Sequence, residues 1–216
     1  MNKLHFATQL LPIGVIIAGM VQETLIALAA FAFVTSITPG PNNLMLMASG
    51  ANFGFRRTVP HMLGIGIGFT FMVALVGLGL ADAFDRWPFL HTAMKIVSVL
   101  YLSWLAWRIA QAAAPGGGES GRRPLSFLQA ATFQWVNPKA WAMALTAVTV
   151  YAPGQSLWAI LLVAVVFGAI NLPAVSTWAV LGQKMRRVLR DPWRLRIFNW
   201  TMAALLVASI APMLRG

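Results

Sequence analysis

The sequence predicts an all-α integral membrane protein with six transmembrane helices, built as two inverted three-helix repeats in which helices 1 and 4 are broken. The first observation is composition: 59% of the 216 residues are hydrophobic, 10% are charged and the mean hydropathy is +0.74. Soluble domains average about 25% charged residues. The second observation is a set of six apolar runs, and the third is a pair of proline motifs that interrupt two of them.

The six apolar runs meet or approach the roughly 20 residues that cross a bilayer as a helix. They cover residues 25–47, 62–81, 89–109, 125–151, 157–181 and 197–214. The runs are long and do not alternate apolar with polar residues, which argues against a membrane β-barrel. The glycine-rich stretch 112–124 is predicted to be a flexible cytoplasmic linker between a first repeat at 20–111 and a second repeat at 125–216.

Residues 1–19 allow two interpretations. Lys3 followed by an apolar stretch resembles a signal peptide, although Pro12 interrupts that stretch and the cleavage site is a poor match. Alternatively, Met20 is the natural start and residues 1–19 are an N-terminal extension. We treat them as an extension in the domain division, because the first apolar segment is complete without them, and leave both interpretations open.

The basic residues predict the orientation of the chain in the membrane. Lys3, Arg86 and Arg215 fall on one side. The other side carries Arg56, Arg57, Arg108, Arg122, Arg123, Lys184, Arg186, Arg187, Arg190, Arg194 and Arg196. Loops rich in lysine and arginine stay in the cytoplasm, so these basic loops are expected to be cytoplasmic and both termini outside. Because the charges lie between apolar runs, the net charge of +11 does not indicate nucleic acid as a partner.

The residue types also argue against several classes of function. The absence of cysteine removes disulfides, thiol chemistry and thiolate metal sites. The three histidines are scattered, and the five acidic residues lie at or outside the ends of the apolar runs. An enzyme, a metal site and a bound cofactor are therefore not expected.

The two proline motifs occupy matching places in the two halves. "SITPGPNN" interrupts the first segment and "QWVNPKAW" the fourth, and in each a proline follows a small polar residue, Thr38 or Asn137. Halves with an odd number of spans have opposite orientations in the membrane. This pattern is typical of an inverted-repeat transporter, whose broken helices meet near the middle of the bilayer.

A broken helix supplies groups that bind a ligand. Proline lacks an N–H and disrupts the bond to the carbonyl four residues before it, so the carbonyls at 35–37 and at Gln134 are expected to be free. The half-helix after each break starts with unpaired N–H groups and a positive dipole end. An amino-acid zwitterion fits both, since it carries a carboxylate and an ammonium. The candidate substrate-binding residues are Pro39, Gly40, Pro41, Asn42, Asn43, Asn137, Pro138, Lys139 and Asn171.

The alternative for these breaks is a structural kink whose polar groups are satisfied by neighbouring helices.

Lys139 is the only charge deep in an apolar segment, where a charge costs roughly 2.5–3.5 kcal/mol. Such a charge indicates function unless the side chain snorkels out of the bilayer. Lys95 lies nearer its segment end, which favours snorkelling. Asn171 and Pro173 make a second polar interruption, in the fifth segment. The "GIGIG" stretch in the second segment predicts close helix packing.

With these motifs the chain resembles the LysE/RhtB family of amino-acid exporters. The resemblance rests on "TPGPNNLMLMASGANFGFRR", "GIGIG", "MKIVSVLYLSWLAWR" and "FQWVNPKAW" and covers about Met20 to the C-terminus. Ser98 and Thr58 stand where the family commonly has glycine, and these departures concern packing. The resemblance implies an exporter of amino acids or their derivatives in the bacterial inner membrane, driven by the proton motive force.

The leading hypothesis is therefore a secondary transporter, and the alternative is a membrane scaffold or assembly protein without a transported substrate. No acidic residue lies deep in an apolar segment, so a cationic side chain would enter the site unpaired. Neutral amino acids such as threonine, homoserine or leucine-like substrates are therefore favoured over lysine and arginine. The expected partners are a small-molecule amino acid and the lipid bilayer, and the sequence leaves homo-oligomerisation open.

Overall fold

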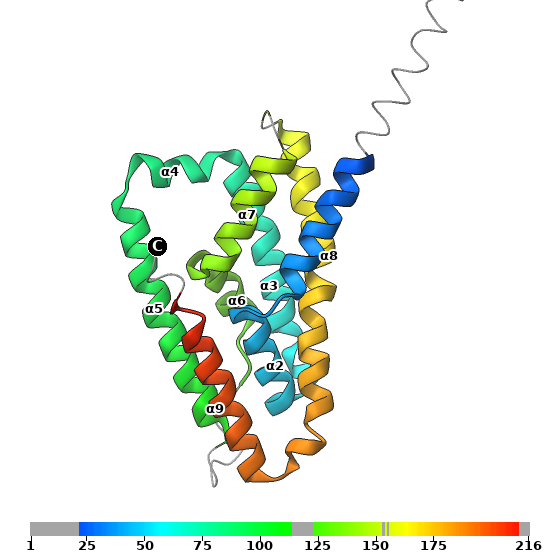
Figure 1. The fold of residues 1–216 in the computed structure, drawn as a ribbon, viewed down its shortest axis with the longest axis vertical. Helices are drawn as coiled ribbons and strands as arrows, with labels where there is room; N and C mark the ends of the chain where they lie inside the picture. Colours follow the sequence, from blue (N-terminus) through cyan, green and yellow to red (C-terminus); the bar gives the residue numbers. More distant parts are fainter. Residues whose placement is uncertain (1–21, 114–122, 153, 155, 212–216) are drawn as a thin grey trace, which may run out of the picture.

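The computed structural model describes residues 22–113, 123–152, 154 and 156–211 and is built from helices, with no β-strand among these residues (Figure 1). This confirms the helical class expected of the sequence. The extension at 1–19 lies outside the described residues, as does most of the linker expected at 112–124.

The helices follow the order of the apolar segments. A first helix, Gln22–Ile37, precedes the break at 38–40. The later elements are α2 (Pro41–Phe53), α3 (Phe55–Leu75), the π-helical turn η1 (Val76–Leu80), α4 (Ala81–Arg86), α5 (Phe89–Ala110), η2 (Gln111–Ala113), α6 (Phe127–Phe133), the 3-10 turn η3 (Gln134–Val136), α7 (Pro138–Tyr151), α8 (Leu157–Met185), η4 (Val188–Arg190) and α9 (Pro192–Ala208).

In the part of the chain that the structure describes, three helices are long and apolar enough to cross a membrane: Phe55–Leu80, Phe89–Ala110 and Leu157–Met185. The pair Gln22–Ile37 and Pro41–Phe53, bent by 55°, would form a fourth span if its two helices cross together. The fourth and sixth predicted segments contain shorter helices, namely α7 of 14 residues after the second break and α9 of 17 residues. The six-span arrangement therefore stays a prediction.

Two helices begin earlier than the apolar runs suggested. α3 starts at Phe55, so that Arg56 and Arg57 lie in its first turn and not in a loop. α9 starts at Pro192 because the carboxylate of Asp191 caps its N-terminus. Helices continue into polar residues at a membrane surface, which a count of apolar residues does not detect.

The most extensive helix contact among the described residues joins α2 and α8, which approach each other at backbone distance. A Cβ on Gly50 would collide with the carbonyl oxygen of Ala179, and a Cβ on Gly182 would collide with that of Met47. Small residues allow helices in a membrane to approach in this way, because lipid supplies no hydrophobic force to drive them together. The two helices are therefore interlocked along the half of α8 that ends at Met185.

The glycines of the "GIGIG" stretch make a second close contact, which confirms the prediction of tight packing. A Cβ on Gly64 would meet the carbonyl of Phe127, and one on Gly68 would lie 2.6 Å from Cα of Ala131, both in α6. Gly66 points toward α8 instead, where a Cβ would lie 3.0 Å from Cδ1 of Leu172. α3 is thereby held between α6 and α8.

The two halves of the chain run in opposite directions around the breaks (Figure 1). The first helix and α2 pass from the upper to the lower end of the molecule, whereas α6 and α7 pass upward. α2, α5 and α8 end at the lower end of the molecule, where the described parts of the connections that follow them also lie. We call this the basic end, because the described arginines of these connections lie there: Arg56, Arg57, Arg108, Arg123, Arg186, Arg187 and Arg190.

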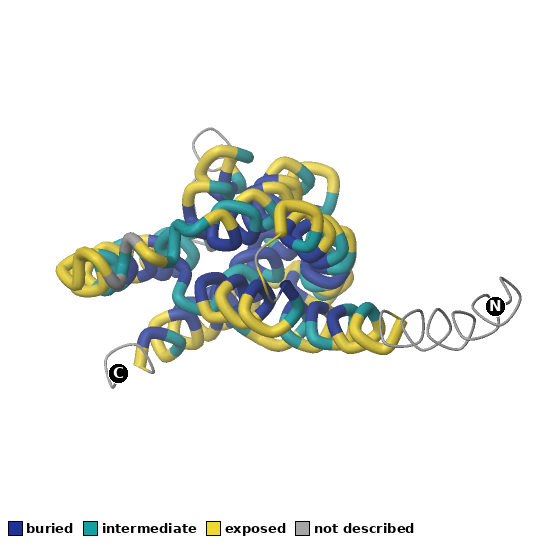
Figure 2. Tube along the Cα trace, turned by 90° about the horizontal axis from the view of Figure 1, so that it is seen from above, coloured by how far each residue is buried: buried dark blue, intermediate teal, exposed yellow. Residues whose placement is uncertain are grey.

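The outer surface of the bundle is apolar. Buried residues line the inside of the ring of helices and exposed residues face outward (Figure 2). Large apolar side chains are exposed along the length of several helices, among them Ile96, Leu100, Leu162, Val165, Leu181 and Val207. Extended apolar surface of this kind promotes aggregation in water but is suited to contact with lipid.

The α2–α8 contact predicts a large cost for Gly182→Ala. We expect the thermal midpoint of the detergent-solubilised protein to fall by an amount equivalent to about 1–3 kcal/mol, because the added methyl must separate two backbones. Gly66→Ala serves as the control, since its Cβ would meet a leucine side chain that can shift. Equal midpoints for the two variants would contradict the interlock.

Candidate functional site

A cavity lies between the two helix breaks, at the place where the first helix, α2, α7 and α8 meet. Including the open space at its mouth it measures about 300 Å³. Six of the predicted site residues line it: Gly40, Asn42, Asn43, Asn137, Lys139 and Asn171. Thr35, Ser36, Phe69, Ala140, Met143 and Val175 complete the lining. Pro39, Pro41 and Pro138 are not lining residues and instead form the breaks.

The first break leaves a helix start without a side-chain cap. Gly40 is extended, and Pro41 opens α2 at the first position, where its missing N–H is no loss. No side chain caps this end of α2. The N–H groups of Asn42 and Asn43 therefore remain without a capping acceptor at the positive end of the α2 dipole.

The second break has the same form but is capped. The chain leaves α6 through η3, Asn137 is extended, and Pro138 opens α7. The Asn137 side-chain oxygen accepts a hydrogen bond of 3.2 Å from the backbone N–H of Lys139. The two matched motifs thus give the same backbone conformation at the two breaks. They differ in one respect: only the start of α2 lacks a side-chain cap and is open to an anion.

Two side chains join the breaks directly. The Asn42 amide donates to Oε1 of Gln134 at 2.9 Å, and the Gln134 amide donates back to Oδ1 of Asn42 at 3.2 Å. Gln134 is fully buried and also donates to the carbonyl of Ala130 at 2.8 Å. Both amides are therefore fixed in orientation, and the start of α2 is held against the end of α6.

Lys139 crosses from α7 to the first break. Its ammonium nitrogen donates to the carbonyl of Thr38 at 2.6 Å and lies 3.5 Å from the carbonyl of Pro39. Gly40 leaves room for this side chain, since a Cβ there would lie 2.8 Å from Cδ of Lys139. The glycine is required here for space and not for its backbone angles, because an extended conformation suits any residue.

Asn171 brings α8 into the site. Its amide donates to the Ser36 hydroxyl at 2.9 Å, while its buried Oδ1 has no hydrogen-bond partner. A buried acceptor without a donor costs about 1–3 kcal/mol, so this oxygen is a ready acceptor for a ligand. α8 itself continues through Pro173, so the expected interruption of this helix is wrong, although Asn171 faces the cavity.

Two of the carbonyls expected to be free before the first break, those of Ser36 and Ile37, are in fact occupied. Asn43 donates to the carbonyls of Ser36 and Thr38, both at 2.8 Å, and the indole of Trp178 donates to that of Ile37 at 3.1 Å. The expectation missed these donors because they come from other turns and other helices. The carbonyl of Gln134 likewise accepts from the backbone N–H of Asn137 at 3.2 Å.

The site is electropositive. Among the described residues no acidic side chain lines the cavity, and Lys139 is its one charged group. No group of three histidine or acidic side chains in the described part of the chain is placed to hold a metal ion. The cavity presents an ammonium, an uncapped helix start, two asparagine amides and a buried amide oxygen. These groups suit a small polar molecule with an anionic group.

The comparisons with known proteins give one family and a set of named relatives. The sequence profile of the LysE type translocator family matches residues 9–212 and so reaches into the segment before Met20. A protein of Klebsiella pneumoniae named cysteine/O-acetylserine efflux protein is 27% identical over 194 residues, 87% of this chain and 95% of its own length. Proteins of the same name from Escherichia coli and Salmonella typhimurium are each 28% identical, over 87% of this chain and 96% of theirs. No solved structure matches the chain.

The reciprocal amide pair predicts strong coupling between the breaks. In a double-mutant cycle with Asn42→Ala and Gln134→Ala, we expect each single change to destabilise the protein and the pair to show a coupling of about 1–3 kcal/mol. Asn52 and Asn199 exchange hydrogen bonds of 2.8 and 3.0 Å in the same way and provide a positive control. Additive effects in chemical unfolding at the Asn42–Gln134 pair would show that the breaks are held by other contacts.

Proposed function

Because the chain belongs to the LysE type translocator family, we propose that it is a secondary transporter that exports amino acids across the bacterial inner membrane. The observation that carries this proposal is the contact between the Lys139 ammonium and the Thr38 carbonyl at the junction of two broken helices. Intramembrane charges that meet unwound backbone near such a junction typically mark a substrate pathway.

Lys139 and the α2 start are placed to hold a carboxylate together. The ammonium reaches across Gly40 to the first break, directly before the open N–H groups of Asn42 and Asn43. A carboxylate between them would accept charge-assisted hydrogen bonds, which are about twice as strong as neutral ones. The positive end of the α2 dipole adds to the attraction.

When a zwitterion binds, Lys139 and the Thr38 carbonyl would each exchange one hydrogen-bond partner for a group of the substrate. The number of hydrogen bonds at the site would not fall. When Lys139 turns from the Thr38 carbonyl to the substrate carboxylate, that carbonyl keeps its hydrogen bond from Asn43 and can accept a second one from the substrate. The substrate ammonium then has two acceptors, the Thr38 carbonyl and the unpartnered Oδ1 of Asn171. The substrate therefore replaces Lys139 at the first break, which gives a physical reason for Lys139 to occupy that carbonyl when the site is empty.

The charge of the site favours neutral amino acids. A lysine or arginine side chain would enter a cavity that holds Lys139 and no carboxylate among the described residues, and a desolvated unpaired charge costs several kcal/mol. Relatives named cysteine/O-acetylserine efflux proteins are named for amino acids without a cationic side chain. We therefore propose small neutral amino acids, including cysteine, O-acetylserine, threonine and homoserine, as substrates.

The proposed mechanism is alternating access driven by the proton motive force. The opposite chain directions of the two broken helices support an inverted repeat, in which one half rocks against the other around a site at their junction. The energy source is proposed from the family alone. The basic end is proposed to face the cytoplasm, because basic loops are retained on that side.

The alternative function is a membrane scaffold without a transported substrate. A scaffold would be expected to satisfy the polar groups of its kinks internally. The first break largely does so, but Asn171 Oδ1 has no partner and the α2 start has no side-chain cap. These two unsatisfied features favour a site that receives a ligand.

Replacing Lys139 provides the main test. We expect Lys139→Met to lower the initial rate of export from loaded vesicles at least about tenfold, because a hydrogen bond to a charged group contributes about 1.5–3 kcal/mol. Lys95→Met is the matched control, since Lys95 lies on α5 and does not line the cavity. The measurement uses O-acetylserine, cysteine, threonine and lysine in parallel. Efficient lysine export without export of the neutral amino acids would overturn the electrostatic argument, and no export of any amino acid would favour the scaffold.

Orientation is tested separately with reporter fusions. Fusions after Arg57, within the linker at 112–124 and after Arg190 should all report a cytoplasmic location, because these points carry the basic residues of the chain. A fusion at Gly154, between α7 and α8, should report the opposite side. A periplasmic result at two of the three basic positions would contradict the proposed orientation.

A further inference from the structure

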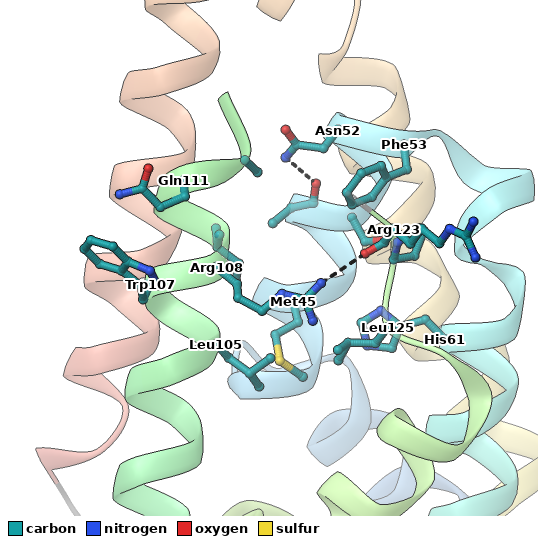
Figure 3. A pocket seen from close by; sticks show the side chains of 15 residues that line it. Met45, Asn52, Phe53, His61, Leu105, Trp107, Arg108, Gln111, Arg123 and Leu125 are labelled. Atoms are coloured by element: carbon teal, nitrogen blue, oxygen red, sulfur yellow. Dashed lines mark hydrogen bonds between the residues drawn. The ribbon is translucent and has the colours of Figure 1, made fainter. Parts of the chain in front are cut away.

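A second and larger cavity opens at the basic end of the molecule (Figure 3). With the space at its mouth it measures about 820 Å³, and it lies between α2, α3, α5 and the segment 123–125. Apolar side chains such as Met45 and Leu105 form much of its wall, with Ser49 and Asn52 as polar groups from α2. None of its residues belongs to the cavity between the breaks.

The most unusual residue of this cavity is His61. Its side chain is 1% exposed, and neither ring nitrogen has a hydrogen-bond partner. Imidazole always carries at least one donor, and its neutral form adds an acceptor. Leaving both unpaired in the protein interior costs free energy, so a buried and unpartnered histidine at a cavity wall calls for a ligand group that pairs with it.

Two arginines line the cavity, Arg108 and Arg123. Arg108, on α5, lies over the ring of Trp104 with 5.0 Å between its Cζ and the ring centroid. It also donates to the backbone carbonyl of Arg123 at 3.4 Å (Figure 3). Among the described residues no acidic side chain lines the cavity, so neither guanidinium is neutralised there. A guanidinium held in this way presents the paired donors that match a carboxylate.

Residues of both cavities lie along one face of α2. Asn42 contacts Gln134 at the upper site, and Met45, Ser49 and Asn52 follow at helical spacing on the wall of the lower cavity. At a rise of 1.5 Å per residue, Asn42 and Asn52 are about 15 Å apart along the helix axis. The two cavities therefore lie one after the other along the same face of α2.

We propose that the cavity at the basic end is a loading site for the transported amino acid, with its carboxylate bound by Arg108 and a polar group bound by His61. The inference rests on the proposed function and assigns a cytoplasmic binding step to that function. The carboxylate is then passed from the guanidinium of Arg108 to the ammonium of Lys139, with apolar walls between that accept a small uncharged side chain.

The absence of native cysteine provides a direct test. Gln111→Cys places a single thiol on the cavity wall, and its reaction with a membrane-impermeant maleimide is followed in inside-out vesicles. O-acetyl-L-serine is expected to slow the labelling, and O-acetyl-L-serinamide, which lacks the carboxylate, is expected not to. Arg187→Cys, at an exposed position of the basic end outside the cavity, is the control thiol and should react at the same rate with and without either compound.

Four further changes in the Gln111→Cys background separate the binding groups from residues outside the cavity. Arg108→Gln and His61→Phe should each raise the concentration of O-acetyl-L-serine that halves the labelling rate by about tenfold, whereas Arg194→Gln, outside the cavity, should leave it unchanged. Lys139→Met should retain protection, because it belongs to the other cavity. His61→Phe should also keep or raise the thermal midpoint, since it removes buried polar atoms that have no partner in the empty protein. A purely structural histidine would instead lower the midpoint.

The outcomes separate this inference from the proposed function. Protection without export would support the loading cavity as a carboxylate site and overturn the transport proposal. Export without protection, equal protection by the amide, or loss of protection in Lys139→Met would overturn the separate loading site and leave transport standing.

Discussion

The structure depends on one constraint: backbone groups released by proline inside an apolar bundle must find partners there. Water is not present in the hydrocarbon layer to satisfy them, and each unsatisfied group costs several kcal/mol. The break at 38–40 frees the carbonyls of residues 36–38, and each receives a donor from Asn43, Trp178 or Lys139. These donors come from three helices, so the break itself fixes how α2, α7 and α8 are arranged around the cavity. Asn43 and Lys139, two of the candidate site residues, are therefore also structural supports of the break.

Local rules read from the sequence located the breaks and most of the site. The proline motifs placed Asn42, Asn137 and Lys139 near one another, because two halves with broken first helices bring those breaks together. The glycine stretch at 64–68 indicated close packing before its partners in α6 and α8 were known. Such features are encoded within a few residues, by a missing N–H, a missing Cβ or a single charge in an apolar run.

Other parts of the site could not be read from local sequence. Gln134 is an ordinary polar residue before the second break, and only the approach of the two halves makes it the partner of Asn42. Pro173 suggested an interruption that α8 does not have, since a membrane helix tolerates proline where neighbouring groups compensate. His61 offered no signal, because a lone histidine has no ligand spacing and its burial at the wall of the lower cavity arises from the packing of α3 against α2 and α6. Contacts of this kind depend on tertiary arrangement and not on residue pattern.

The distribution of close contacts also bears on how a transporter of this shape could move. α2, α3, α6 and α8 approach through glycine at backbone distance, so small displacements within this group meet hard steric limits. α5 and α9 join the bundle through larger apolar side chains, including Leu102, Leu105 and Leu206, which can slide and repack. The cavity at the basic end lies between these two groups of helices, with α2 on one side and α5 on the other. Motion of α5 and α9 against the interlocked group would therefore open or close that cavity while leaving the junction of Lys139 and Thr38 intact, which separates loading from binding at the breaks.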